Sequence, residues 1–333
     1  MFQRRLLHLA ALVAALTCLS LGLMVEPERA LGAADAGATW GADYFPNVPL
    51  ISHEGKKVRF FDDLIKGKVV MVNFIFTSCP DVCPLETARL REVQKLLGER
   101  VGKDVFMYSI TIDPKVDTPA VLKAYAEKYQ VAPGWMFLTG QPDDIILLRK
   151  KLGMYGKEDE AGNLSTHNLN LILGNQKTGK GMKASPFENP YILATQVGSW
   201  LHNWKLPPKP SQEYQDAPVV RHVSRGESLF RTRCAACHTI GAENILASAQ
   251  QPIGPDLLGV TKNRERAWLV RWLAEPDKML AENDPLAISL LAAYNNVPMP
   301  NLRLNQLEID ALLDYLEEER ARIEHLRTPG HHH

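Results

Sequence analysis

The first two thirds of the chain alternate short apolar segments with segments of helical periodicity. Residues 68–76 (KVVMVNFIF) form an almost unbroken apolar run, which is typical of a strand buried on both faces of a sheet. The pattern predicts an extended, turn-rich start at residues 34–58, further strands at 106–112, 135–139 and 168–173, and helices following Pro84 and at 118–129, 143–152 and 190–204. Strands that alternate with helices predict an α/β domain with a mostly parallel core.

A proline-rich segment separates this domain from a second one, in which the pattern predicts helices only. Residues 205–220 contain four prolines, a composition typical of a semi-rigid spacer. Beyond it, Ser224 and Glu227 form a capping-box pattern at the start of one helix, and Asn305 and Glu308 form a similar pattern at the start of the last. We therefore expect an α/β domain at 33–204, a linker at 205–220, an all-α domain at 221–325 and a tail at 326–333.

The N-terminus has the features of an export signal. Arg4 and Arg5 precede a mostly apolar stretch at residues 6–25, and small residues at Ala30 and Gly32 offer a cleavage site. The apolar stretch exceeds the usual length of about 7–15 residues in a cleaved signal, so residues 1–32 could also stay as a membrane anchor. Either alternative places the remaining chain in the periplasm or at the outer face of the cytoplasmic membrane.

Composition and charge exclude two classes of protein. The 333 residues include 38 Lys and Arg and 38 Asp and Glu, so the chain has no basic excess for binding nucleic acid. Apart from the N-terminus, no apolar run reaches the roughly 18–20 residues that span a bilayer, which excludes a polytopic membrane protein. Beyond Cys18, the cysteines form two close pairs, Cys79 with Cys83 and Cys234 with Cys237, and such pairs indicate metal, haem or redox chemistry rather than a disulfide scaffold.

The second pair belongs to the sequence Cys234-Ala-Ala-Cys237-His238, which is the attachment signature of haem c. The two thiols form thioether bonds to the haem, and the histidine presents its imidazole to the iron. A redox Cys-x-x-Cys beside an unrelated histidine, or half of a zinc site, would be the alternatives. The signature occurs in a chain with an export signal, which favours haem.

Residues 220–325 resemble the class I c-type cytochromes. The resemblance rests on the haem signature, on the Gly254-Pro255 segment, and on Met299, which precedes the last predicted helix. It implies that His238 and Met299 are the two axial ligands of one covalent haem, with Met279 as a rival for the second position. With both axial positions filled, electron transfer is the expected role rather than oxygen activation.

The first cysteine pair lies where a buried strand meets a helix. Cys79 and Cys83 are four residues apart, so on a helical turn their side chains are neighbours. Amide groups at a helix N-terminus lower thiol pKa values, and we therefore expect both cysteines to be biased toward the thiolate. Two thiolates suit Cu(I), with an imidazole as third ligand. A redox dithiol or a structural disulfide would be the alternatives.

Spacing alone does not choose the third copper ligand. The candidate histidines are His53, His167, His202 and His222. Among them, His167 immediately precedes a predicted strand, and ligand groups gather at strand ends in α/β sheets.

Residues 40–204 resemble the Sco/SenC family of copper-binding proteins with a thioredoxin-like fold. The matching segments are residues 73–84 (NFIFTSCPDVCP) and 109–114 (SITIDP) with Asp117-Thr118-Pro119. The resemblance implies that Cys79, Cys83 and His167 bind copper. Asp113 matches an acidic position near the site, although a plain turn at the strand end would also explain it.

Together the two resemblances imply an exported copper metallochaperone that serves the dinuclear copper subunit of cytochrome c oxidase. The haem c domain would exchange electrons with the copper or dithiol site. The alternatives are a thiol–disulfide oxidoreductase that acts on the cysteines of the oxidase copper site, or a periplasmic electron carrier. Other periplasmic redox proteins are further expected partners, and a metallochaperone is favoured over an enzyme.

Overall fold

The computed structural model describes residues 44–80, 82–164, 167–202, 223–241 and 253–327. The expected signal or anchor at residues 1–32 and the expected linker at 205–220 lie outside these residues. Within the described ranges, no helix combines the length and the apolar character that crossing a bilayer requires. The α/β domain and the helical domain are described one after the other.

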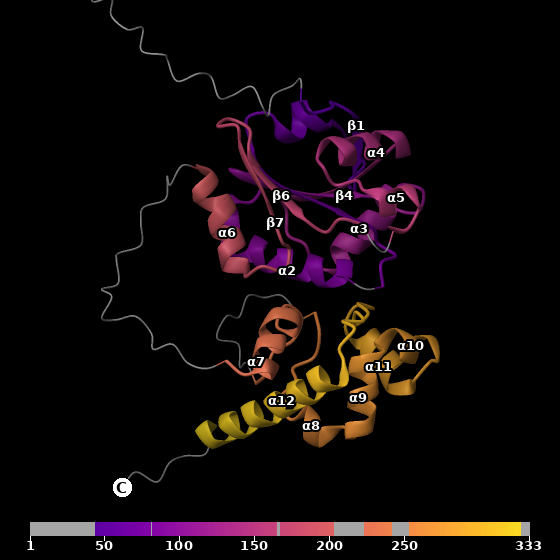
Figure 1. The fold of residues 1–333 in the computed structure, drawn as a ribbon, viewed down its shortest axis with the longest axis vertical. Coiled ribbons are helices and arrows are strands. Elements are labelled where there is room, and N and C mark those ends of the chain that lie inside the picture. Colours follow the sequence, from indigo (N-terminus) through magenta and orange to yellow (C-terminus); the bar gives the residue numbers. More distant parts are fainter. Residues whose placement is uncertain (1–43, 81, 165–166, 203–222, 242–252, 328–333) are drawn as a thin grey trace, which may run out of the picture. The chain divides into compact units, whose positions relative to one another are not determined.

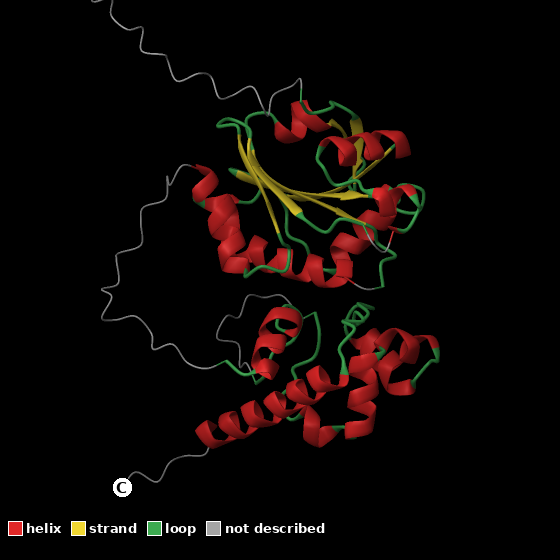
Figure 2. Cartoon of the chain, in the orientation of Figure 1, coloured by secondary structure: helices red, strands yellow, loops and turns green. Residues whose placement is uncertain are grey.

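A seven-stranded sheet forms the centre of the first domain (Figures 1 and 2). Its strands are β1 (Pro49–Ser52), β2 (Lys57–Arg59), β3 (Val69–Ile75), β4 (Val105–Thr111), β5 (Trp135–Gly140), β6 (Leu171–Asn175) and β7 (Lys180–Ala184). They are ordered β2-β1-β5-β4-β3-β6-β7 across the sheet. The expected thioredoxin-like α/β fold is confirmed.

The predicted parallel core consists of the three central strands of the sheet. Strand β4 pairs in parallel with β3 and with β5, whereas all the other pairings are antiparallel. The antiparallel strands come from two hairpins, β1–β2 and β6–β7, and a hairpin needs only a short turn where a parallel pair needs a long crossover. Strands β1, β2 and β7 are short and partly exposed, so their sequences lack the apolar run that identified β3.

The four longer helices of the first domain begin close to where the sequence predicts, whereas the short helix at Lys157–Glu160 was not predicted. They are α2 (Val82–Leu97), α3 (Pro119–Lys128), α4 (Pro142–Lys151), α5 (Lys157–Glu160) and α6 (Pro190–Gly198), with the short helical turns η2 (Phe60–Ile65), η3 (Gly98–Arg100) and η5 (Trp200–His202). Thr118 caps α3, because its hydroxyl accepts a hydrogen bond from the amide of Val121. Helices cover both faces of the sheet (Figure 2), and α6 packs against α2.

Two boundaries differ from the prediction. The last helix ends at Gly198 rather than at residue 204, because Ser199 leaves the helical conformation and a separate turn, η5, follows. Strand β6 begins at Leu171 rather than at residue 168. The side chain of Asn168 accepts a hydrogen bond from the amide of Asn170 at 3.0 Å, and this local turn delays the strand.

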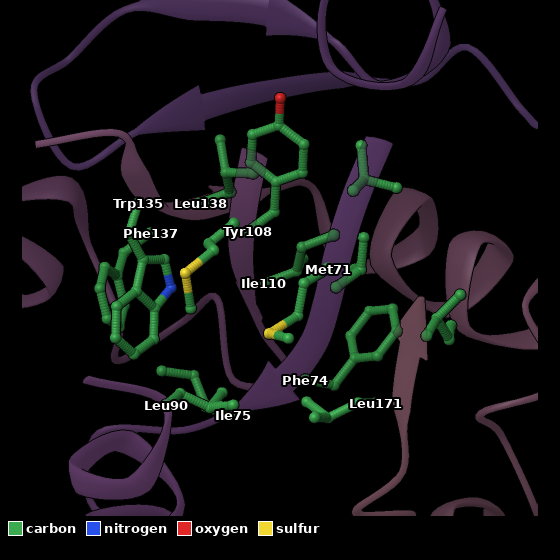
Figure 3. Packing of buried hydrophobic residues seen from close by; sticks show 14 of the residues in the cluster. Met71, Phe74, Ile75, Leu90, Tyr108, Ile110, Trp135, Phe137, Leu138 and Leu171 are labelled. Carbon is green, nitrogen blue, oxygen red and sulfur yellow. The ribbon is translucent and has the colours of Figure 1, made fainter. Parts of the chain in front are cut away.

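The core of this domain lies on the central strands (Figure 3). All seven residues of β3 are buried, as expected for a strand covered on both faces. Side chains of β3, β4, β5 and α2 pack together, among them Phe74, Ile110, Phe137 and Leu90. Each such side chain contributes roughly 1.5–3 kcal/mol through burial, so the strand ends that carry the candidate site rest on a rigid base.

All the regular elements in the described residues of the second domain are helices, which confirms the expected all-α fold. Its helices are α7 (Arg225–Leu229), α8 (Val260–Asn263), α9 (Arg266–Ala274), α10 (Pro276–Ala281), α11 (Pro285–Ala293) and α12 (Gln306–Arg327), with a helical turn η7 (Phe230–Cys234) after α7.

Both predicted caps of the second domain are present. The Ser224 hydroxyl accepts a hydrogen bond from the amide of Glu227 at 3.1 Å. At the start of α12, Asn305 and Glu308 bond reciprocally, each side chain accepting from the amide of the other. The apolar face of α12 is buried and packs against α7. A side chain at Gly226 would overlap the carbonyl of Ala311, so glycine permits this close approach.

Candidate functional site

The two thiols of the first domain lie at the junction of β3 and α2. Cys83 is in the first turn of α2 and is completely buried, whereas Cys79 lies in the preceding loop and is 6% exposed. Both cysteines are free thiols, and a hydrogen bond joins their side chains. The amide of Cys79 also donates a hydrogen bond to the carbonyl of Phe76 at 3.3 Å. The structure therefore brings the two predicted sulfur donors together.

The expected bias toward thiolates is wrong for Cys83. The hydrogen bond with Cys79 raises the pKa of the Cys83 thiol, and burial raises it further. The amides at the helix N-terminus favour the thiolate of Cys83. Burial and the hydrogen bond with Cys79 favour the protonated thiol, and these two effects are the larger ones here. In the metal-free dithiol form, Cys83 therefore keeps its proton at neutral pH.

His167 is buried near the end of the same strand. Its Nδ1 lies 2.8 Å from the carbonyl of Leu164, and its Nε2 lies 3.1 Å from the carbonyl of Phe74. A neutral imidazole has one N–H, so only one of these contacts is a hydrogen bond at a time. Burial lowers the pKa of His167, and the two carbonyls act in the opposite direction. The neutral ring is therefore favoured, and a neutral ring nitrogen is what a metal ligand needs.

Phe76 connects His167 to the two thiols. Its ring meets the imidazole of His167 edge-on at 5.6 Å between centroids, and its backbone bonds to Cys79 and Cys83. All three predicted copper ligands thus lie around the carboxyl end of β3. Within the described ranges, however, no three His, Cys, Asp or Glu side chains converge as a metal site. The Nε2 of His167 faces the Phe74 carbonyl instead, so the three-ligand copper site stays a prediction.

The other candidate histidines occupy different places. His53 accepts a hydrogen bond from the amide of Phe137 at 3.1 Å, so its Nδ1 holds the backbone of β5. His202 lies in η5, after α6. His222 lies outside the described residues. The donors that fit a soft copper ion by type are therefore the two sulfurs of Cys79 and Cys83 and the imidazole of His167.

Sequence reasoning assigned no role to two buried carboxyl groups near this site. Glu86 is fully buried on α2, where it accepts a hydrogen bond from the Asn73 side chain at 2.8 Å, and burial raises its pKa to about 8. Asp117 is also fully buried and accepts hydrogen bonds from Thr77.

A signal for the first of these was present in the sequence. Glu86 lies one helical turn after Cys83 and four residues before the apolar face position Leu90, which places a carboxyl group on the buried face. Asp113 contributes its backbone to a turn, because its amide donates to the Thr111 hydroxyl and its carbonyl accepts from two later amides.

In the second domain, the haem signature begins at Cys234, the last residue of η7. Cys234 and Cys237 are free thiols, and burial raises the pKa of each to about 12. His238 is half-buried, and loss of solvation lowers its pKa, so the neutral ring is favoured. The carbonyl of Pro255 accepts a hydrogen bond from Nδ1 of His238 at 2.8 Å, which leaves Nε2 as the free donor for iron.

Residues 254–257 pack on this signature. The amide of Gly254 donates to the carbonyl of Cys237 at 2.9 Å, and the hydroxyl of Thr239 donates to Asp256 at 2.6 Å. A Cβ added at Gly254 would lie 2.6 Å from Cε1 of His238. Glycine at position 254 therefore leaves the room that the imidazole ring of His238 occupies.

A cavity that is open to solvent lies among the helices of this domain. His238 and Met299 both line it, together with Cys234 and a largely apolar wall that includes Trp268, Trp272, Leu290, Leu312, Leu313 and Leu316. The rival ligand Met279 is 1% exposed, packs in α10 and does not line this cavity. The pocket, its thiols and the oriented imidazole fit a covalent haem c.

Comparisons with known proteins agree with this division. The SCO1/SenC family model matches residues 40–202, and the cytochrome c family model matches residues 223–319. A SCO2-like protein of Rickettsia typhi is 36% identical over 149 residues, which cover 43% of this chain and 70% of that protein. The chain spans about half the length, 54%, of the SCO2-like proteins of Rickettsia felis and Rickettsia conorii.

Two solved structures resemble the two parts. Bradyrhizobium japonicum ScoI, solved with copper bound, is 27% identical, with a TM-score of 0.38, covering 46% of this chain and 98% of that one. The cytochrome c domain of a Pseudomonas putida protein is 56% identical, with a TM-score of 0.27, covering 30% of this chain and 91% of that one.

Proposed function

We propose that this protein, which belongs to the SCO1/SenC family over residues 40–202 and carries a cytochrome c domain at residues 223–319, is an exported copper metallochaperone. Its partner would be the dinuclear copper subunit of cytochrome c oxidase. The solved structure of BsSco is described as that of a member of the Sco family of cytochrome c oxidase assembly proteins, and the SCO1/SenC match of residues 40–202 is the reason for this choice of partner. The observation that carries the proposal is the buried, hydrogen-bonded Cys79–Cys83 pair at the end of β3, which Phe76 connects to the buried His167.

Copper would be the cargo of the first domain. Cys79 and Cys83 would supply two sulfur ligands, and His167 would supply a nitrogen once its Nε2 leaves the Phe74 carbonyl. Because the pKa of Cys83 is raised, loading must displace a proton from its thiol. Copper affinity should therefore rise with pH, and acid should favour release to a partner.

The second domain would hold one haem c through Cys234 and Cys237, with His238 and Met299 on the iron. Such a group supplies a one-electron acceptor whose potential is raised by the methionine ligand. The residues of this chain fix the imidazole through Pro255 and exclude water with the apolar wall of the cavity. In this proposal the haem domain exchanges electrons with the copper or dithiol site.

Replacement of His167 tests the copper site. In the full chain, His167→Ala should reduce copper retention by at least tenfold in competition with a Cu(I) chelator, because one of three ligands is lost. His325→Ala changes an exposed histidine on α12 and serves as the matched control. Unchanged copper retention in His167→Ala would contradict the role of this histidine. A copper content near zero in wild-type protein purified under reducing conditions would contradict the metallochaperone proposal.

A thiol–disulfide oxidoreductase is the second candidate. The observation in its favour is that His167 is engaged with backbone carbonyls while the two thiols contact each other. An oxidoreductase would reduce a disulfide in the partner's copper-site cysteines, and His167→Ala would leave that activity largely intact. A dithiol assay on a disulfide-bonded peptide, run beside the copper assay, separates the two functions.

A further inference from the structure

The two cysteines of the first domain are held in different ways. Cys83 belongs to a 16-residue helix, α2, whose packing on the sheet fixes its position. Cys79 lies in the loop between β3 and α2, and its own amide makes a long hydrogen bond of 3.3 Å to Phe76. The separation of the two sulfurs therefore depends on what fixes the loop.

A buried carboxylate fixes the start of this loop. Asp117 is fully buried, 40 residues along the chain from Thr77, which lies two residues before Cys79. One oxygen of Asp117 accepts from the Thr77 amide at 3.1 Å and from the Thr111 hydroxyl at 2.6 Å. The other oxygen accepts from the Thr77 hydroxyl. Within the described ranges, Asp117 forms no ion pair. These three hydrogen bonds therefore replace the water that its buried carboxylate has lost.

Asp117 connects the loop to the end of a central strand of the sheet. Thr111 is the last residue of β4, and the amide of Ile112 donates to the carbonyl of Ile75, the last residue of β3. Asp117 thus ties the loop that bears Cys79 to the end of a neighbouring central strand. Burying a carboxylate without a cation costs several kcal/mol, and a hydroxyl or amide side chain could close a turn at lower cost.

We propose that Asp117 is a positioning residue for the dithiol. Through Thr77 it holds Cys79 within reach of Cys83, and so it sets both the copper affinity of the pair and its tendency to form a disulfide. The copper part rests on the proposed function, whereas the disulfide part needs only the two thiols. Loss of such supporting groups typically lowers metal affinity 10–100-fold.

Variants at Thr77 test this inference with little change in volume. Thr77→Val removes the hydroxyl that bonds Asp117 and keeps the backbone amide, whereas Thr77→Ser keeps both donors and is the matched control. Asp117→Asn alters all three bonds and is the stronger perturbation. Thermal unfolding of each full-length variant shows whether it is folded at the assay temperature, and Thr77→Val provides the test if Asp117→Asn does not fold.

Two measurements are made on each folded variant. The first is Cu(I) affinity, by competition with a chelator. The second is the equilibrium with glutathione, in which one oxidised glutathione takes two electrons and two protons from Cys79 and Cys83, giving one intramolecular disulfide and two reduced glutathiones. We expect Thr77→Val to lower the copper affinity and the disulfide equilibrium constant at least tenfold, while Thr77→Ser stays within twofold of wild type.

Values within twofold of wild type in a folded Thr77→Val would overturn the inference, whether or not Asp117→Asn folds. So would a loss of thermal stability with both thiol readouts unchanged, because Asp117 would then support only the fold. Wild-type protein that binds no Cu(I) but shows the expected glutathione effects would overturn the proposed function and leave the role of Asp117 intact.

Discussion

The buried carboxyl group of Glu86 should make the stability of the first domain fall as pH rises. Burial raises its pKa from 4.5 to about 8 in the folded protein, with the Asn73 hydrogen bond acting in the opposite direction. Between these two pH values the unfolded chain has lost the proton that the folded protein still binds. The folded state therefore binds more protons, and its free energy of unfolding decreases toward pH 8.

The size of the effect follows from the pKa difference. Each pKa unit corresponds to about 1.36 kcal/mol, so the full change between pH 4.5 and 8 is at most about 5 kcal/mol. The neighbouring Cys79 is one cause of the raised pKa of Glu86, so its effect is already included in this figure. The pKa values of Cys83 and Tyr125 are themselves raised, so both groups stay protonated over this range and leave the pH dependence unchanged. Wild-type protein should thus lose several kcal/mol of stability between pH 5 and pH 8.

Glu86→Gln removes the titration. The amide can still accept from Asn73, but its second polar atom replaces a carboxyl oxygen that has no partner among the described residues. An unpartnered buried amide costs about 1–3 kcal/mol, so the variant should be less stable than wild type at pH 5. At pH 8 the order should reverse, because only the wild type must then carry a buried charge.

Urea unfolding of the reduced protein at pH 5, 6, 7 and 8 measures this difference. Circular dichroism follows the secondary structure of both domains, and haem absorbance follows the second domain alone, so comparing the two signals isolates the unfolding of the α/β domain. Glu99→Gln is the control, because the Glu99 side chain is 93% exposed and should give a difference that does not depend on pH. Parallel stability curves for Glu86→Gln and wild type would refute the reasoning, since Glu86 would then ionise alike in both states.

Two further predictions concern other buried groups. Gly254→Ala would place a Cβ 2.6 Å from His238, so the ring must shift, and we expect about 1–3 kcal/mol lower stability and a changed haem spectrum, measured by thermal unfolding and absorbance. An unchanged spectrum would contradict the packing of Gly254 on the haem ligand. Asp159→Asn should lower the free energy of unfolding by about 3–5 kcal/mol, because Arg149 forms a buried ion pair with Asp159 and would be left without it. A urea-unfolding difference below about 1 kcal/mol would show that this pair is open to water.

The haem site shows how far local sequence can determine a site. The signature at Cys234, Cys237 and His238 depends on spacing within five residues, so it needs no knowledge of the fold. The caps at Ser224 and Asn305 are also local, and the structure contains both as predicted. Helix and strand types follow from periodicity in the same way, which is why β3 and α12 could be predicted without coordinates.

Only the tertiary structure shows which groups from distant segments of the chain contact one another. The carbonyl that faces His167 Nε2 belongs to Phe74, 93 residues earlier in the chain, and Asp117 reaches 40 residues back to Thr77. The raised pKa of Cys83 likewise depends on burial and on a second thiol, which outweigh the local effect of the helix start. Spacing along the chain fixes what neighbouring residues can do, whereas burial and long-range hydrogen bonds depend on which strands pair. The sequence therefore predicted the residue types of the proposed copper site, whereas the fold determined their protonation states and their hydrogen-bond partners.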